Sequence, residues 1–166
     1  MKLLTADRKV SRLLKMTKGE SFGFTPTCDD ASPFPREWFP LLPATPVQYL
    51  QRMALLNELR PELETRLEGF AVVEEKLVVV TSQRFIDPAA APQPAISAFF
   101  GERGFEQLSE FAWYHTHLNL AVFDVTPANV LEYDGRLYPV DIMPVEPRPM
   151  MRRLIRRALK MPFESR

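Results

Sequence analysis

The chain has 166 residues, of which 46% are hydrophobic, so it is long enough to bury the core of one domain. Its 21 Lys and Arg residues balance its 21 Asp and Glu residues, which excludes a net charge that would steer the whole protein to nucleic acid or membranes. A single cysteine, Cys28, excludes an internal disulfide, and no run is apolar enough for a signal peptide or a membrane span. These features predict a cytoplasmic protein without a transmembrane segment.

The first half of the chain predicts strands and one helix. Residues 8–16 are expected to form a short strand, and the Pro-rich segment 25–46 is expected to pack on the body of the protein because it carries aromatic residues. Residues 47–59 predict a helix, since apolar residues recur near a 3.6-residue period and Pro61 follows. Residues 69–74 and 76–81 are expected to form a hairpin.

The second half predicts three further helices. A short helix is expected at 95–100, ended by Gly101, and a longer one at 105–117. Residues 148–160 predict a basic amphipathic helix, with Met150, Met151, Leu154, Ile155, Ala158 and Leu159 on one stripe and Arg152, Arg153, Arg156, Arg157 and Lys160 opposite. Such a helix can contact an anionic membrane, nucleic acid or a partner protein, but we favour docking of its apolar stripe on the domain, with the cations in solvent.

A tight hairpin is expected between residues 130 and 140. Asp134-Gly135 is a dipeptide that a two-residue type I′ turn prefers. With this turn, residue 133 faces 136 and residue 131 faces 138, so Asn129 and Asp141 become neighbours at the open end of the hairpin. A regular pleat would send their side chains to opposite faces, so at least one of them is expected in irregular backbone.

The polar residues around this hairpin suit a hard cation. Asp124 lies five positions before Asn129, and Asp141 lies twelve positions after it. Carboxylate and amide oxygens at such short separations can share a divalent ion. Pro127 and Pro139 lack a backbone donor, which favours an edge strand or a bulge at both places.

In order and spacing, Asp124, Asn129 and Asp141 resemble the catalytic loop and metal-binding Asp of protein-kinase-like phosphotransferases. The resemblance extends from about residue 67 to 144. It includes segments similar to the fourth and fifth strands, the hinge and the next helix of that family, at Leu67 to Phe70, Leu77 to Ile86 and Gly104-Phe105. It points to the branch of aminoglycoside and choline kinases, and most closely to the small kinase-like domains of bacterial and phage polyvalent proteins.

The resemblance implies binding of ATP and Mg²⁺ and transfer of a phosphoryl group to a hydroxyl of an unidentified small molecule or protein. Asp124 would orient the hydroxyl and accept its proton, and Asn129 and Asp141 would hold Mg²⁺. The backbone from Gln83 to Phe85 would meet the adenine edge. A strand lysine would grip the phosphates; Lys15 is the best candidate, with Lys9 and Lys18 as alternatives.

The sequence also departs from the family pattern. No glycine-rich loop precedes Lys15, because the first glycine is Gly19. Val122-Phe123 and Ile142-Met143 replace the His-Arg and Phe-Gly pairs that flank the catalytic and metal-binding Asp residues of protein kinases. The acidic partner of the lysine is Glu58 or is replaced by Asn57. These departures support an alternative, a catalytically inactive remnant (pseudokinase) that acts as a binding module.

The expected fold is one α+β domain over residues 1–166, with a minimal protein-kinase-like architecture. Residues 1–86 would form a small antiparallel sheet lobe with an insertion at 25–46. Residues 87–147 would form a reduced helical lobe with the catalytic hairpin, and 148–166 a basic tail helix. Only 25 residues follow Asp141, too few for the large helical half of a protein kinase.

Overall fold

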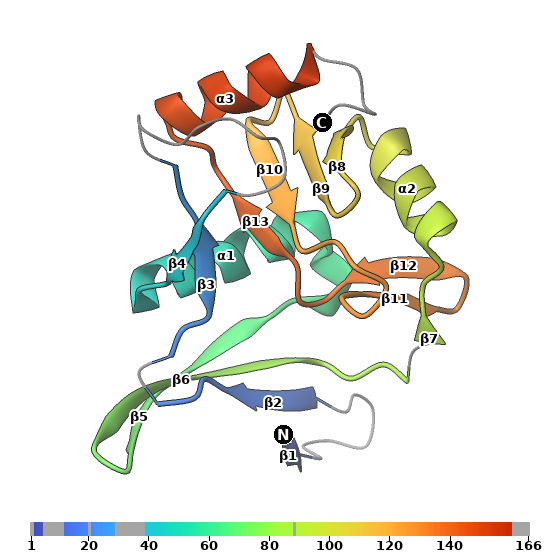
Figure 1. Ribbon diagram of the computed structural model, residues 1–166. Coiled ribbons are helices and arrows are strands. Elements are labelled where there is room, and N and C mark those ends of the chain that lie inside the picture. The colour runs from blue at the N-terminus through green and yellow to red at the C-terminus, as the bar shows by residue number, and fades with distance from the viewer. Residues whose placement is uncertain (1, 5–11, 20, 29–38, 88, 161–166) are drawn as a thin grey trace. The chain divides into compact units, whose positions relative to one another are not determined.

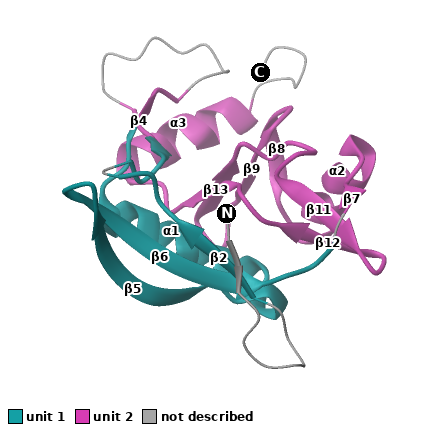
Figure 2. Ribbon diagram, turned by 90° about the horizontal axis from the view of Figure 1, so that it is seen from below, with its two compact units in different colours: residues 1–25, 43–87 teal, residues 26–42, 88–166 magenta. Residues whose placement is uncertain are grey.

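The computed structural model describes residues 2–4, 12–19, 21–28, 39–87 and 89–160 (Figure 1). The chain divides into two compact units: unit 1 comprises Met1–Thr25 and Pro43–Asp87, and unit 2 comprises Pro26–Leu42 and Pro88–Arg166 (Figure 2). Small antiparallel sheets and α-helices occur in both, which confirms the α+β class. None of the helices in the described ranges is long and apolar enough to cross a membrane.

Unit 1 is built on a four-stranded sheet in the order β1-β2-β6-β5. The strands are β1 (Lys2–Leu4), β2 (Arg12–Met16), β5 (Arg66–Val73) and β6 (Lys76–Arg84), and all neighbours are antiparallel. The expected hairpin is confirmed: β5 and β6 are joined by Glu74 and Glu75, whose φ angles of +50° and +62° suit a two-residue turn. The strands extend further than expected because a bulge between Leu67 and Gly69 lets pairing continue to Arg66.

The expected helix in unit 1 is α1 (Pro46–Leu59). It begins one residue before the predicted start, because Thr45 and Gln48 form a capping box and Pro46 has a preset φ that suits the first turn. It ends at Arg60, before Pro61 and the short 3₁₀ turn Pro61–Leu63. Its inner face packs Tyr49, Leu50 and Met53 around Val79 of β6, which is fully buried.

Unit 2 contains a second four-stranded antiparallel sheet, in the order β13-β10-β9-β8. Its strands are β8 (Glu106–Ser109), β9 (Ala112–His115), β10 (Leu120–Phe123) and β13 (Met143–Val145). Helix α3 (Pro149–Leu159) lies on it, with Met151 and Ile155 packed among Leu108, Ala112, Tyr114 and Ala121. This confirms the expected docking of the apolar stripe, and most of the cations of α3 are exposed.

The helix expected at 105–117 is wrong, because that segment forms the hairpin β8–β9. Tyr114 of β9 is buried against α3. The preceding residue, Trp113, points to the other face of the sheet and stacks on Phe100 of α2 (Gln93–Glu102), with ring centroids 5.8 Å apart. A strand buried on both faces has a continuous apolar run, which periodicity alone cannot distinguish from a buried helix. Helix α2 itself confirms the short helix expected at 95–100.

In the described parts of the Pro-rich segment 25–46, Phe39 packs on the protein as expected, whereas Leu41–Pro43 is exposed. Strands β3 (Phe24–Pro26) and β4 (Leu41–Pro43) pair with each other. Phe39 packs edge-on against Phe123, with ring centroids 5.4 Å apart, and joins the core of unit 2 beside α3. Residues 29–38 lie outside the described residues.

Candidate functional site

The hairpin expected between residues 130 and 140 is present. Strands β11 (Val130–Tyr133) and β12 (Arg136–Pro139) pair with Tyr133 opposite Arg136 and Leu131 opposite Tyr138. Asp134 and Gly135 form the turn, with φ angles of +50° and +68°, and two positive values identify the expected type I′ family. Strand β7 (Ala89–Ala90) pairs with β11 on its other side, so Pro139 lies in an edge strand, where its missing donor is tolerated.

The open end of the hairpin joins the two predicted metal ligands. The backbone carbonyl oxygen of Asn129 accepts a hydrogen bond from the backbone N–H of Val140, with an N–O distance of 2.8 Å. The backbone nitrogen of Asp141 lies 3.5 Å from the same oxygen. The N–H groups of Asn129 and Val130 both donate to the carbonyl of Thr126, which closes a tight turn just before β11. Asn129 lies in this turn and Asp141 in a bend, so both occupy irregular backbone, as the pleat argument required.

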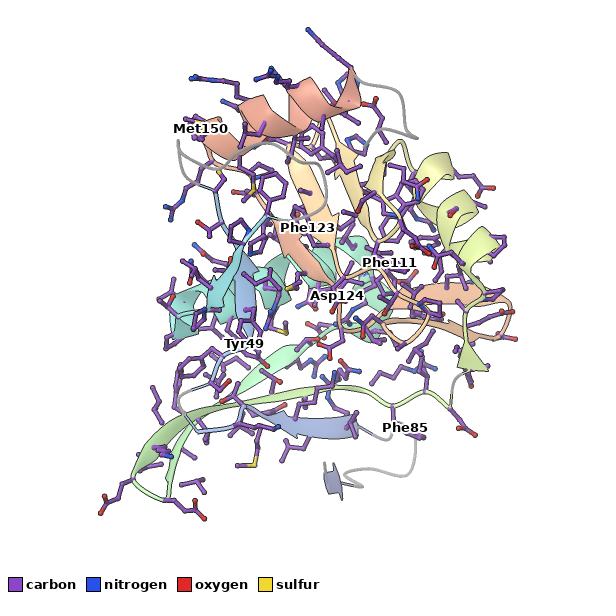
Figure 3. The ribbon with its side chains drawn as sticks, viewed as in Figure 1. Tyr49, Phe85, Phe111, Phe123, Asp124 and Met150 are labelled. Atoms are coloured by element: carbon purple, nitrogen blue, oxygen red, sulfur yellow. The ribbon has the colours of Figure 1, made fainter. Side chains whose placement is uncertain are left out.

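Asp124 is held over the same turn by its backbone and by its side chain. It follows β10 with a φ of +58°, a left-handed conformation that Asp and Asn adopt more readily than most residues. The amide Nδ2 of Asn129 donates to the Asp124 carbonyl oxygen at 2.9 Å and to its Oδ2 at 2.8 Å. The next residue, Val125, is fully buried and donates its N–H to the carbonyl of Phe111 in the β8–β9 turn. Figure 3 shows Phe111 beside Asp124.

The electrostatics of this cluster suit a proton acceptor next to a cation. Burial raises the pKa of the Asp124 carboxyl; the hydrogen bond from Asn129 lowers that pKa, and the negative charge of Asp141 raises it. Asp124 and Asp141 are therefore close enough to repel each other. A bound cation would relieve this repulsion.

The donor set fits a magnesium ion that keeps much of its own water. Both recorded bonds of the Asn129 side chain use Nδ2, and no donor in the described ranges reaches its Oδ1. Asn129 and Asp141 thus offer one amide and one carboxylate group at the open end of the hairpin, where the charge of Asp141 also acts on Asp124. No group of three or more His, Cys, Asp or Glu side chains within the described parts of the chain could form a metal cage. Mg²⁺ needs no such cage, because it is often held by one or two carboxylates together with water and phosphates.

The residues predicted to contact the nucleotide belong to unit 1. Lys15 of β2 lies directly opposite Thr81 of β6, and Leu13 lies opposite Gln83. Directly opposed residues share a face of the sheet, so Lys15 lies on the face of Thr81. Alternate residues along β6 share that face, so it also carries Val79 and Gln83, and α1 covers it at Val79. Phe85 follows the end of β6 and is exposed, whereas the side chain of Gln83 is buried.

The structure therefore brings three of the predicted residues together in unit 2, namely Asp124, Asn129 and Asp141. Lys15, Gln83 and Phe85 lie in the other compact unit. Of the alternative lysines, Lys18 is exposed after the end of β2, and Lys9 lies outside the described residues.

Sequence reasoning missed a side chain of α1 that reaches β6, the strand paired with the strand of Lys15. The two proposed partners were Glu58, which is exposed, and Asn57, whose amide group binds both backbone groups of Thr65, at 2.7 and 2.8 Å. Instead, the buried Tyr49 places its hydroxyl 3.5 Å from Oγ1 of Thr81, the residue opposite Lys15. The apolar periodicity of α1 could have identified Tyr49 as an inward-facing residue, because it lies two helical turns before the buried Leu56.

Comparison with known families supports the resemblance seen in the sequence. Residues 42–144 match the family described as serine/threonine/tyrosine kinases found in polyvalent proteins. No curated protein and no solved structure matches the chain. The match does not test the relation to aminoglycoside and choline kinases. Because it spans more than half of the 166 residues, the chain belongs to the family of kinases found in polyvalent proteins.

Proposed function

We propose that the protein is a phosphotransferase that uses ATP and Mg²⁺ to phosphorylate a hydroxyl group of a small molecule or protein. The observation that carries this proposal is the cluster at the end of the hairpin, where Asn129 holds Asp124 by two hydrogen bonds and shares a backbone junction with Asp141. Phosphoryl transfer requires mainly positioned groups and charge neutralisation; this cluster positions Asp124 and would supply the neutralisation through a bound cation.

In this proposal Asp124 is the catalytic residue. Its carboxylate accepts a hydrogen bond from the attacking hydroxyl and takes the proton as the hydroxyl oxygen bonds to the γ-phosphorus of ATP; the bond from that phosphorus to the β–γ bridging oxygen breaks, and ADP leaves. The hydrogen bonds from Asn129 restrict the carboxylate to one orientation. A pKa raised by burial makes Asp124 a stronger proton acceptor than a fully solvated Asp.

Asn129 and Asp141 would hold Mg²⁺ through Oδ1 and a carboxylate oxygen. When bound, the ion neutralises the charge on the nucleotide phosphates. Unit 1 would supply Lys15 for the α and β phosphates and the backbone from Gln83 to Phe85 for the adenine edge. The two compact units would then correspond to a reduced N-lobe and a reduced C-lobe of a minimal protein-kinase-like fold.

A second candidate function is that of a binding module without catalysis. Val122 is fully buried in β10 and Phe123 packs on Phe39, so the positions that hold His and Arg in protein kinases serve the core here. Neither position therefore offers a polar or charged side chain next to Asp124. The two functions share a fold and differ in nucleotide binding and turnover.

Nucleotide binding is tested by thermal unfolding with ATP, with and without MgCl₂. A ligand at a hundred times its dissociation constant stabilises by about 2.7 kcal/mol. For a chain of this size that corresponds to a rise in Tm of about 5 to 11 °C. Asp141→Asn should abolish the Mg²⁺-dependent part of the rise, whereas the control Glu132→Gln, which removes an exposed carboxylate from β11 of the same hairpin, should keep it. No rise at millimolar ATP would contradict the proposal and favour the binding module.

Catalysis is tested by transfer of labelled γ-phosphate to water or to the chain itself. Asp124→Asn should retain the Mg²⁺-dependent rise in Tm and lose turnover. Equal turnover in the wild type and this variant would remove Asp124 from the catalytic role.

A further inference from the structure

The exposed side of α3 carries a concentration of positive charge. We call Arg152, Arg153, Arg156, Arg157 and Lys160 the α3 cationic face. Residues 147–160 contain these five residues, Arg148 and no Asp or Glu, so this segment has a charge of +6 in a chain with a net charge of zero. The rest of the chain therefore has a charge of −6. Nitrogen-tipped side chains of α3 project away from the sheet of unit 2 (Figure 3).

The apolar side of α3 is already used by the fold. Met151, Ile155 and Ala158 are buried, and the first two belong to the core cluster of unit 2. An amphipathic helix that lies in a membrane surface buries its apolar face among the lipids. To do this, α3 would have to leave the core; while it is docked, its exposed side chains are mainly cationic, and Met150, Leu154 and Leu159 are half-buried.

The charges of this face are not consumed by ion pairs within the described residues. The ion pair that the described residues do form joins Arg66 to Glu64, and both of these belong to unit 1. Arg153, Arg156 and Arg157 are exposed. Their guanidinium groups are available for an external anion, and the planar fork of Arg suits phosphate oxygens in particular.

The spacing of the cations fits a phosphate backbone. Arg152 and Arg156 form one row and Arg153 and Arg157 a parallel one, with a rise of about 6 Å between members of a row. Duplex nucleic acid presents one negative charge per about 1.7 Å of axis, so a row of this length meets several phosphates. The helix contains no aromatic residue for base stacking and no Asn or Gln for reading base edges.

We propose that the α3 cationic face binds the phosphate backbone of double-stranded nucleic acid without sequence preference. This contact is independent of the proposed phosphotransferase activity. It would bring the chain to a polyanion even though its net charge is zero.

The test is fluorescence anisotropy of the full chain, without ATP, on labelled duplex DNA, duplex RNA and single-stranded DNA over a salt series. We expect binding to duplexes of unrelated sequence, with a slope of log K against log salt of about −4. The double variant Arg153→Gln/Arg157→Gln should make this slope shallower by about two and weaken binding about tenfold or more at low salt. The control Arg66→Gln/Arg136→Gln removes two exposed arginines outside α3 and should leave both quantities unchanged.

Four results would overturn the proposal. They are no binding to any duplex, tighter binding to single strands than to duplexes, equal weakening by the control pair, or retention on phosphatidylserine vesicles without binding to nucleic acid. A comparison of DNA with RNA duplexes then identifies the source of the phosphates. The substituted side chains are exposed, so both double variants should unfold at the same temperature as the wild type. This result would exclude loss of the fold as the cause of weaker binding.

Discussion

The left-handed backbone at Asp124 predicts that Asn and Ala at this position will differ strongly in stability. Asp124 has a φ of +58°, and its Oδ2 accepts a hydrogen bond from Asn129 at 2.8 Å. Asn tolerates this backbone and can accept the same bond through Oδ1, whereas Ala does neither. The pair of variants therefore separates the backbone and hydrogen-bond contributions from the loss of charge, which both share.

The expected difference follows from two contributions. The left-handed conformation costs Ala about 1 kcal/mol relative to Asn. The lost hydrogen bond costs about 0.5 to 1 kcal/mol, at the lower end of the range because Asp124 is only partly buried. The sum of about 1.5 to 2 kcal/mol lowers Tm by about 3 to 8 °C in a chain of this size. Asp124→Asn should lie within about 0.5 kcal/mol of the wild type or above it, because its neutral amide is not repelled by Asp141.

The assay is urea and thermal unfolding of the wild type, Asp124→Asn and Asp124→Ala at pH 7, without nucleotide. Equal stability of the two variants would show that residue 124 is not left-handed and does not receive the bond from Asn129. A large loss in Asp124→Asn would show that the carboxylate stabilises the fold, against the direction of its pKa.

Three further predictions concern pH, turns and the lysine strand. Because the pKa of Asp124 is raised in the folded chain, its carboxylate destabilises the fold above that pKa, and this effect fades as the pH falls through it. Turnover should fall over the same range, while the stability advantage of Asp124→Asn over the wild type should shrink in unfolding experiments against pH. Gly135→Ala should lower the free energy of unfolding by about 1 kcal/mol, because the φ of +68° disfavours Ala although nothing lies near the added Cβ. Gly101→Ala should raise the free energy of unfolding by about 0.5 to 1 kcal/mol, because Gly101 lies in helix α2 and its added Cβ is equally uncrowded. Tyr49→Phe keeps the ring among its core neighbours but removes the hydroxyl next to Thr81, opposite Lys15; it should weaken ATP binding several-fold by calorimetry and leave adenosine binding unchanged.

Local sequence chemistry determined several features of this protein. The turn at Asp134-Gly135 sets the register of its hairpin, and a tight register is enough to place Asn129 near Asp141. The bounds of α1 follow from a capping box and a proline, and the docking of α3 follows from its apolar stripe. In each case the deciding sequence pattern lies within one short segment, although the surface on which α3 docks, between Leu108 and Ala121, lies far back along the chain.

Tertiary structure decided the features that depend on segments far apart in the sequence. Residues 106–115 form strands rather than a helix because α2 and α3 bury opposite faces of β9, and no local pattern records both neighbours. The division into two units and the approach of Tyr49 to the strand opposite Lys15 likewise depend on how the sheets assemble. The pKa of Asp124 is raised by burial and by Asp141, seventeen positions away, because electrostatic energy depends on distance in space and not along the chain.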